Sequence, residues 1–441
     1  MFRIRWNLLD WPSAFSRMST TASIEQQLVP IVGAENLRAA SAADRIGNLQ
    51  PKFVVEPSTE QQLAAALAFA NKSGLTVIPR GGATKLDWGN PPKSADLILS
   101  TARLNRILEH AWSDLTVTVQ AGCTLQSLQQ TLAEHGQRLA LDALWPDRAT
   151  IGGALSTNDS GALRLRFGSL RDLIIGVTLA LPDGTLASSG GKVVKNVAGY
   201  DLPKLATGAL GTLGVITRAV FRVHPLPHAA ATLTCVANQA SEAAHLFAQL
   251  LDSQLAYSAL QTRVQANHNP QFFVDIIFEG TGQGIAAQIA QLQTLASPLS
   301  FSPSDHSVWQ AREQLHFQTP ADTFSALFKI SAQPADAILA ISDSATIAAR
   351  ASANFSAVVQ ATGLGTILLA GDQPVVSSVA QTFRKRMETA GGSLVALGNA
   401  ALTAELDAWG NPGDALPLMR AIKHQLDPNN TLNPGRFVGG I

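Results

Sequence analysis

The chain has 441 residues, a formal net charge of zero and a pI near 7, so it is long enough for two or three domains and gives no electrostatic case for nucleic-acid binding. Charged residues make up 15% of the chain, against roughly 25% in ordinary globular proteins. This composition hints at surface buried against a partner, although Ala-rich genomes give the same signal. The two cysteines, Cys123 and Cys235, are far apart, which argues against an iron–sulfur cluster or structural zinc and favours a reduced, cytosolic compartment.

The first seventeen residues carry three Arg, two Trp and a single Asp. Such a segment is typical of an organellar transit peptide or an interfacial anchor. Met18 opens a second plausible N-terminus, so we expect residues 1–17 to be a non-native extension from an upstream start codon. No apolar run in the chain approaches the length of about eighteen residues needed to cross a bilayer.

Strands and helices alternate through the first half of the chain. Capping-box spacing, apolar periodicity and turn residues predict these elements: a helix from Ser58 to Gly74, a buried strand over 75–79, a strand over 115–120, a helix from Thr124 to Gly136, a hairpin turned at 182–184 and a strand over 214–224. Pro225 and Pro227 then mark a boundary.

Beyond Pro227, strands and helices alternate without a glycine-rich loop, which predicts an antiparallel sheet with βαβ-like units. The last forty residues are again dense in Gly, Pro and Asn. We therefore expect a cofactor domain over 18–228 with its core at 48–228, a cap over 229–404, and a C-terminal segment over 405–441 that returns to the cofactor domain.

Three glycine clusters lie in the first half: Gly81-Gly82, the segment 150–161 and the segment 208–214. Consecutive glycines let successive N–H groups point into one concavity, an anion-binding nest. Arg80 beside the first cluster adds a positive charge. Each cluster alone is more often a tight turn, but three in one domain favour a large phosphate-bearing cofactor.

Other cofactor motifs fit poorly. The segment 208–214 is spaced GxxGxxG and leads into a strand, which fails the nicotinamide Rossmann pattern, and Lys192 after Gly190-Gly191 lacks the Ser or Thr of a P-loop. The SxxK match Ser189–Lys192 has no SDN or KTG companion. The nine histidines are scattered without HExxH spacing, so no metal site is predicted.

Taken in order, these segments resemble the FAD-binding domain of the vanillyl-alcohol oxidase/p-cresol methylhydroxylase (PCMH) family. The resemblance covers roughly residues 48–228 and the C-terminal motif LDPNNTLNPGRF. It implies an α+β fold: a two-subdomain PCMH-type FAD-binding domain, an inserted α/β cap domain and a C-terminal tail that returns to the FAD domain. The implied cofactor is FAD.

A closer similarity, carried by GGKVVKNVAGYDLPKLATGALGTLGVIT and the C-terminal segment, is to FAD-binding E subunits of bacterial glycolate oxidases. It implies oxidation of glycolate to glyoxylate in a complex with a flavin-containing catalytic D subunit and an iron–sulfur F subunit. The implied location is cytoplasmic, with peripheral contact to the inner membrane through the complex.

The resemblance also implies which residues bind FAD. Arg80 to Thr84 would wrap the pyrophosphate, a second loop would follow the ribityl chain and the ring, and later segments would contact the adenine, the pyrimidine edge and the isoalloxazine. The implied cofactor-binding residues are Arg80, Gly81, Gly82, Ala83, Thr84, Thr150, Gly152, Gly153, Ser156, Thr157, Asn158, Gly161, Gly211, Gly214, Val215, Ile216, Asn433 and Arg436.

Departures from the family carry their own expectations. Covalent members place a histidine just after the paired glycines, where this chain has Ala83 and Thr84, so FAD is expected to be non-covalent. The HxGDGNxH-like metal segment of the 2-hydroxy-acid dehydrogenases is missing, and His316 and His424 are isolated. No carboxylate-binding Arg or proton-abstracting His is assigned, so catalytic residues stay unknown and substrate oxidation is expected mainly in the partner subunit.

Two alternatives stay open. One is a stand-alone FAD-linked 2-hydroxy-acid or alcohol dehydrogenase, and the other is a non-catalytic assembly subunit that binds no flavin. Lys195, Asn196 and Tyr200 are candidate ring-side groups, although Asn196 and Tyr200 are as readily explained as braces of their own loop.

Overall fold

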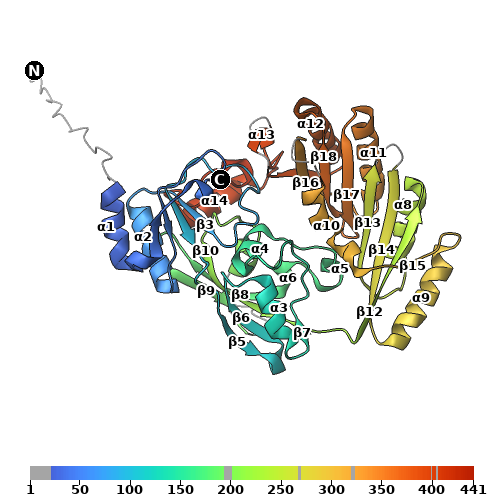
Figure 1. Ribbon diagram of the computed structural model, residues 1–441, viewed down its shortest axis with the longest axis horizontal. Coiled ribbons are helices and arrows are strands. Elements are labelled where there is room, and N and C mark those ends of the chain that lie inside the picture. The colour runs from blue at the N-terminus through green and yellow to red at the C-terminus, as the bar shows by residue number, and fades with distance from the viewer. Residues whose placement is uncertain (1–20, 193–200, 267–269, 319–322, 399, 404–405) are drawn as a thin grey trace, which may run out of the picture.

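The computed structural model describes residues 21–192, 201–266, 270–318, 323–398, 400–403 and 406–441. The expectations for residues 1–17 and for Lys195, Asn196 and Tyr200 lie outside these ranges. Figure 1 shows two halves: an N-terminal half drawn in blue to green and a cap half drawn in yellow to brown, with the C-terminal segment returning to the first half.

The first subdomain is a small sheet covered by two helices. Its strand order is β1-β2-β4-β3, with β1 antiparallel and the others parallel, and the bounds are β1 Leu37–Ala39, β2 Phe53–Val55, β3 Val77–Arg80 and β4 Leu97–Ser100. Helices α1 (Thr21–Val32) and α2 (Glu60–Lys72) pack beside each other. Helix α2 buries the predicted apolar face, but its N-cap is Thr59, one residue later than expected, and the Gln62 side chain accepts from the Ser58 N–H.

The second subdomain is an antiparallel sheet with short helices. Its order is β5-β6-β10-β8-β9, with bounds β5 Ile107–Ala111, β6 Thr116–Gln120, β8 Ile174–Ala180, β9 Leu186–Gly190 and β10 Val215–Arg222. The predicted hairpin is the β8–β9 pair. The helices are α3 Leu125–Ala133, α4 Ile151–Thr157, α5 Arg164–Phe167, α6 Leu170–Leu173 and α7 Leu202–Ala206.

A two-stranded ladder, β7 (Gln137–Arg138) with β11 (His224–Pro225), lies where the chain leaves this subdomain for the cap. Arg138 of this ladder forms a two-pronged ion pair with Glu279 of the cap, with both N–O distances at 2.7 Å. Both side chains are mostly buried. The junction between the two halves is therefore held by a charged pair as well as by the chain itself.

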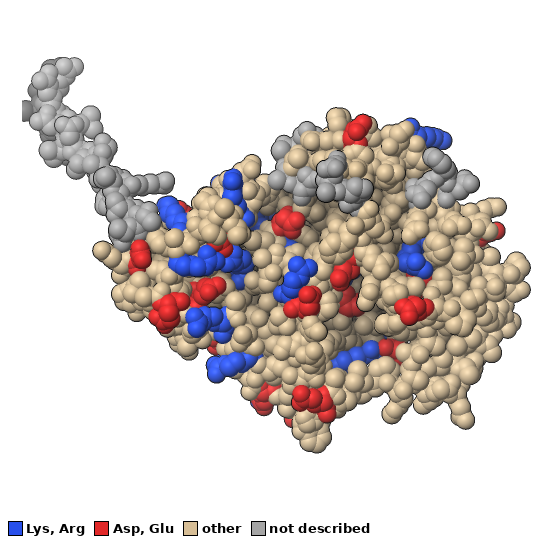
Figure 2. Space-filling view, in the orientation of Figure 1, with Lys and Arg blue, Asp and Glu red and all other residues tan. Residues whose placement is uncertain are grey.

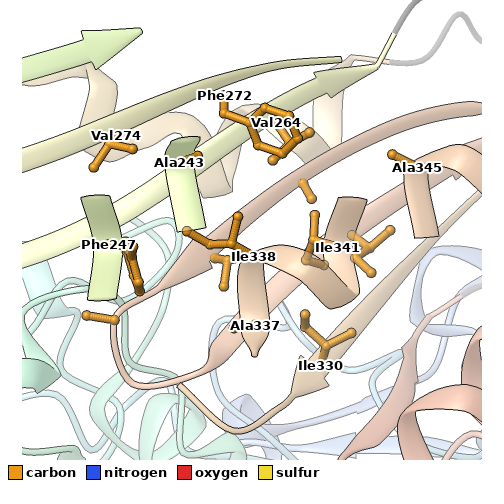
Figure 3. Close-up of a cluster of buried hydrophobic side chains, with 14 of the residues drawn as sticks. Ala243, Phe247, Val264, Phe272, Val274, Ile330, Ala337, Ile338, Ile341 and Ala345 are labelled. Carbon is orange, nitrogen blue, oxygen red and sulfur yellow. The ribbon is translucent and has the colours of Figure 1, made fainter. Parts of the chain in front are cut away.

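The cap is an antiparallel sheet of order β15-β12-β14-β13-β17-β18-β16-β19. Its bounds are β12 Ala229–Ala237, β13 Tyr257–Ala266, β14 Pro270–Gly280, β15 Ser302–Pro303, β16 Ser325–Ser331, β17 Asn354–Gln360, β18 Leu364–Ala370 and β19 Ser393–Leu397. Its main core includes residues of the helices α8 Ala240–Asp252, α9 Gly282–Ala296, α11 Ala337–Arg350 and α12 Gln373–Thr389. Figure 3 shows Phe247 of α8 and Ile338 of α11 meeting over the sheet.

The cap sheet contacts the first half through smaller clusters. Leu397 of β19 joins Trp88, Leu144 and Trp145 of the first half, while within the cap the short helix α10 (Ala311–Gln314) packs against Val358 and Leu368. A bridge pairs Trp88 with Leu397. Side chains on this side of the sheet therefore face the glycine-rich loops.

The C-terminal segment completes the first half. After α13 (Ala400–Thr403), α14 (Leu416–Leu426) leads to Leu432, which pairs in parallel with Val77 of β3. Buried Lys423 donates to the Thr212 and Leu432 carbonyls and to Asp427 at 2.6–3.0 Å. These bonds join segments more than two hundred residues apart in sequence.

Candidate functional site

A groove runs between the glycine-rich loops, with about 670 Å³ of empty space that is partly open to solvent. We call it the glycine groove. The sequence-predicted residues line it with the exception of Asn158 and Gly161. Sequence reasoning did not anticipate five further lining residues: Pro79, Lys85, Leu86, Thr101 and Leu210.

The glycines of the first two loops are required by how closely those loops approach. A Cβ on Gly81 would collide with the Thr150 hydroxyl, and one on Gly82 would collide with the Arg148 carbonyl. A Cβ on Gly152 would lie 2.9 Å from that of Ala121. Only glycine allows the two loops to touch while bare backbone faces the groove.

Arg80 does not offer the free charge that its position beside the glycines predicts. Its Nη1 donates to Asp44 Oδ1 at 2.8 Å, and Asp44 also pairs with Arg38. Hydrogen bonds from Arg38, Arg80 and Ser41 hold the pKa of Asp44 well below its usual value, although burial opposes this. Arg80 therefore lines the groove with its charge partly neutralised, and the backbone of the loops supplies most of the anion-binding character.

The C-terminal candidates Asn433 and Arg436 both line the groove. Arg436 is 3% exposed and donates from Nη2 to the Leu86 and Trp88 carbonyls at 2.7 and 2.9 Å. Burial lowers its pKa to about 10. Asn433 donates to the Leu210 carbonyl, while its Oδ1 is buried without a protein partner. An unsatisfied acceptor on the wall of a groove is what a hydrogen-bonding ligand would complete.

Asn158 and Gly161 lie outside the groove. Asn158 ends α4 in the left-handed conformation (φ 46°) and lines the adjacent cavity. Gly161 donates its N–H to Asp142 Oδ1 at 2.8 Å, and a Cβ there would meet that carboxylate. Its role is to support the second loop.

The adjacent cavity, which we call the apolar cavity, has about 810 Å³ of empty space. It shares Thr157 and Leu210 with the glycine groove, so the two spaces lie side by side. Both halves of the molecule and the C-terminal segment form its walls: Trp88, Gly89, Thr157, Asn158, Gly208, Leu210, Lys329, Ile330, Ser331, Leu364, Ser393, Val395, Leu397, Trp409 and Phe437.

A smaller space, the polar pocket, opens between the second loop and the cap sheet, and its empty volume of about 360 Å³ includes open solvent. It shares Trp88, Lys329, Leu364 and Leu397 with the apolar cavity. The remaining residues around it are mainly polar: Leu144, Asp159, Ser160, Arg312, Gln360, Gly365 and Thr366.

A buried ion network forms one wall of the polar pocket. Asp159, with a fully buried side chain, is 3.1 Å from Lys85 Nζ and 2.7 Å from Arg312 Nη1. Burial opposes its ionisation, but Arg312 and Lys85 hold the pKa of Asp159 well below its usual value. Arg312 also donates to the Ser160 and Asp142 carbonyls. The network joins Lys85 of the first loop, Asp159 of the second loop and Arg312 of the cap.

Lys329 of β16 differs from these cations because no ion-pair or hydrogen-bond partner is found for its side chain in the described part of the chain. Its side chain lines both the apolar cavity and the polar pocket. Burial lowers its pKa below the ordinary lysine value. Asp159 opposes that shift, and nearby Arg164 and Arg312 reinforce it.

His316, one of the isolated histidines, lies behind this pocket. Its ring meets Trp145 edge-on, with centroids 4.6 Å apart, and its Nε2 is buried without a partner. Burial and the charge of Arg312 lower its pKa to about 4. His316 is therefore neutral at physiological pH. His424, on α14, is in a different part of the molecule.

Comparisons with known proteins agree with this geometry. Residues 51–190 match the family described as FAD binding domain. Glycolate oxidase subunit GlcD of Bacillus subtilis is 24% identical over 95% of this chain and 97% of its own length. D-2-hydroxyglutarate dehydrogenase of Xanthomonas citri is 27% identical over 88% of this chain and 89% of its length. D-lactate dehydrogenase of Archaeoglobus fulgidus is 35% identical over 39% of this chain and 38% of its length.

Solved structures support the fold. p-Cresol methylhydroxylase is 13% identical with a TM-score of 0.75, and 4-ethylphenol oxidase of Gulosibacter chungangensis is 14% identical with a TM-score of 0.74. Each of these two matches covers 94% of this chain and 96% of the chain in the solved structure. The fold is α+β with a PCMH-type FAD-binding domain, as expected. The chain is an FAD-dependent oxidoreductase related to glycolate oxidase subunits and 2-hydroxy-acid dehydrogenases, and its cofactor is FAD.

The residues present fit FAD. A diphosphate needs accessible backbone N–H groups, and Gly81 and Gly82 bring bare backbone to the groove wall, whereas the Gly152 N–H is bonded to the Ala121 carbonyl. The unsatisfied Asn433 Oδ1 offers an acceptor to a polar edge of the cofactor. An aromatic ring system needs an apolar slot, and the apolar cavity lies beside the groove.

Proposed function

We propose that this chain binds FAD non-covalently and oxidises a small 2-hydroxy acid at the polar pocket. The observation that carries the proposal is the placement of Lys329 and Arg312 in a small pocket beside the apolar cavity. A 2-hydroxy-acid substrate is supported by the names of the relatives, which include glycolate oxidase, D-lactate dehydrogenase and D-2-hydroxyglutarate dehydrogenase.

In this proposal the glycine groove holds the pyrophosphate and the ribityl chain, and the apolar cavity holds the isoalloxazine ring. The residues assigned to FAD in the sequence analysis would serve, with Asn158 on the ring side and Gly161 as a support of the second loop. When bound, FAD supplies a two-electron acceptor for the carbinol carbon. The groove-lining residues include no His, Cys or Tyr in the described ranges, which supports a reversible complex.

The substrate carboxylate would bind Arg312. Nη1 of Arg312 donates to Asp159 and to the Ser160 carbonyl, and Nη2 donates to the Asp142 carbonyl. The Nε proton and the second Nη2 proton are therefore left to donate to a carboxylate. Asp159 is the carboxylate that pairs directly with both Lys85 and Arg312, so two cations share one ion-pair partner. A mono-anionic substrate would supply a second negative partner.

Substrate charge tests this assignment directly. Purified FAD-loaded protein is mixed anaerobically with glycolate, D-lactate or D-2-hydroxyglutarate, and with the neutral amides glycolamide and lactamide. We expect at least one acid to bleach the visible flavin absorbance while its amide does not. Equal reduction by acid and amide would contradict carboxylate recognition in the pocket.

An alternative to a self-sufficient enzyme places the chain as the E-type subunit of a glycolate oxidase complex. It would then act with a flavin-containing D subunit and an iron–sulfur F subunit, at the cytoplasmic side of the membrane. In the described ranges, no helix is long and apolar enough to span a bilayer. The relative that aligns over nearly the whole chain is named as the D subunit of a glycolate oxidase, so it supports a place in such a complex without favouring the E-type role.

Co-purification distinguishes the complex from the stand-alone dehydrogenase. The tagged chain is isolated from its native cells, and flavin and iron are counted per copy. Two further chains with bound iron support the complex, whereas a lone flavoprotein that turns over substrate with a dye supports the dehydrogenase. A colourless protein would favour the assembly role instead.

A further inference from the structure

We propose that Lys329 is the group that accepts the hydroxyl proton of the substrate. The inference rests on the proposed function, because it names a catalytic residue within the same pocket. It answers the question left by the sequence, in which no histidine could be assigned as the base.

The position of Lys329 is the first argument. It is on β16, a strand paired on both sides, with Lys329 opposite Thr366 of β18 and Val395 of β19. Such a strand fixes the direction of the side chain. The side chain lines both the apolar cavity proposed for the flavin ring and the polar pocket proposed for the substrate. A proton acceptor for 2-hydroxy-acid oxidation must lie at that junction.

The second argument is that the other candidates are committed elsewhere. Lys85 and Arg312 are paired with Asp159, and Arg436 bonds backbone carbonyls. His316 has an unpaired Nε2, but it is not among the residues that line either space. Among the described residues of the pocket, Lys329 alone combines access to the cavity with a titratable nitrogen that has no assigned partner.

The third argument is electrostatic. A lysine is a base only when it is neutral, which requires a lowered pKa. Groups from three elements act on Lys329: Asp159 from the second loop favours its charge, while Arg164 of α5 and Arg312 of α10 oppose it. Burial acts in the same direction as the two arginines. A substrate carboxylate bound at Arg312 would favour the ammonium form that exists after the proton has been transferred.

The step balances as follows. The O–H bond of the substrate breaks and its proton moves to the neutral Lys329 Nζ, which becomes an ammonium group. The C–H bond at the carbinol carbon breaks with its electron pair, for which an oxidised flavin is the acceptor, and a C=O bond forms. The product is the 2-oxo acid, and the lysine later returns its proton to solvent.

The test uses the FAD-loaded protein with three variants: Lys329→Gln, Lys329→Arg and the exposed cap control Lys385→Gln. The rate of anaerobic flavin reduction and the affinity for unreactive oxalate are measured for each. Arginine keeps a charge but cannot act as a base. Loss of a general base should slow reduction by roughly 10²–10⁴-fold in both Lys329 variants. Lys329→Arg should still bind oxalate, and Lys385→Gln should match the wild type.

A second readout does not depend on turnover. Competitive acetylation of the wild-type protein over a pH series, read by mass spectrometry, reports the titration of each lysine. We expect Lys329 to become reactive at lower pH than Lys385. The proposal would be overturned if both lysines showed the same pH profile. It would also be overturned if the flavin of Lys329→Arg were reduced at a rate within about threefold of the wild-type rate, since a general base contributes far more.

The two outcomes of failure are distinguishable. If no 2-hydroxy acid reduces the wild-type flavin, the proposed function is wrong and the role of Lys329 falls with it. If an acid reduces the wild type and Lys329→Arg equally fast, the function stands and Lys329 is not the base. The labelling experiment applies even where a Lys329 variant does not fold.

Discussion

At the scale of single residues, the glycines of the first loop give the sharpest information. Gly81 and Gly82 were recognisable from the sequence because they form the first of three glycine clusters in one domain and follow Arg80. Why both positions must be glycine became visible only in the folded structure, where they lie against the Thr150 hydroxyl and the Arg148 carbonyl. Lys329 and Arg312 gave no local signal, since each is an ordinary residue in a strand or a short helix until the cap sheet places it over the second loop.

Gly82→Ala tests the loop contact. The added Cβ collides with backbone that cannot rotate away, so the first loop must shift and lose cofactor contacts. Losing one hydrogen bond to a charged group costs about 1.5–3 kcal/mol, so the Kd for FAD should rise at least roughly tenfold. Titration of apo-protein with FAD measures this. The control is Gly282→Ala on α9, where a Cβ meets nothing within 4 Å; equal affinities in both variants would contradict the argument.

His316 predicts a pH dependence of stability. Its folded-state pKa of about 4 is below the ordinary 6.5, so the unfolded chain binds more protons between these values. The stability contributed by neutral His316 is present above pH 6.5 and is lost as the pH falls toward 4. We expect the wild type to lose on the order of 2 kcal/mol more than His316→Phe between pH 7 and 4.5. Urea unfolding at both pH values measures this difference, and identical losses would show that His316 is not the source.

At the scale of elements, the buried network Lys85–Asp159–Arg312 links two cofactor loops to the cap. Asp159 lies inside the glycine-rich segment 150–161, but the sequence gave no reason to join it to Lys85 or to Arg312, about 150 residues away. Strand and helix positions were recoverable from apolar periodicity. Contacts between segments far apart in the chain were not, because they depend on how the cap sheet lies over the loops.

Asp159→Asn should uncouple these elements. It leaves Lys85 and Arg312 as buried charges without a counter-charge, which costs roughly 3–5 kcal/mol. The matched control is Glu109→Gln, which breaks the exposed Lys192–Glu109 pair and should cost less than about 1 kcal/mol. Chemical denaturation of both variants tests the expectation. A loss for Asp159→Asn as small as that of the control would mean that the network does not hold the cap in place.

At the scale of the whole molecule, the charge distribution fits the composition. Figure 2 shows acidic and basic side chains interspersed over one face, with broad uncharged areas and no large patch of a single sign. The sequence predicted the fold class and the cofactor through an ordered set of motifs spread over both ends of the chain. It did not predict the polar pocket, because a pocket between two halves has no sequence pattern of its own.

The reversible cofactor is a prediction about the whole protein. Ala83 and Thr84 stand where covalent family members are expected to have histidine, and Ala83 lines the groove with a left-handed backbone, φ 57°. Acid precipitation should therefore release all of the flavin into the supernatant, where its absorbance is measured. Flavin that remains in the washed precipitate would contradict non-covalent binding.

The central claim is that this chain, with its own FAD, oxidises a 2-hydroxy acid without help from another subunit. Anaerobic stopped-flow mixing of the isolated, FAD-loaded chain with a panel of 2-hydroxy acids tests it most directly. The account predicts loss of the oxidised flavin absorbance in a single phase whose rate saturates with acid concentration. An isolated chain that holds FAD but stays oxidised with every acid, and is reduced only when partner subunits are added, would contradict it.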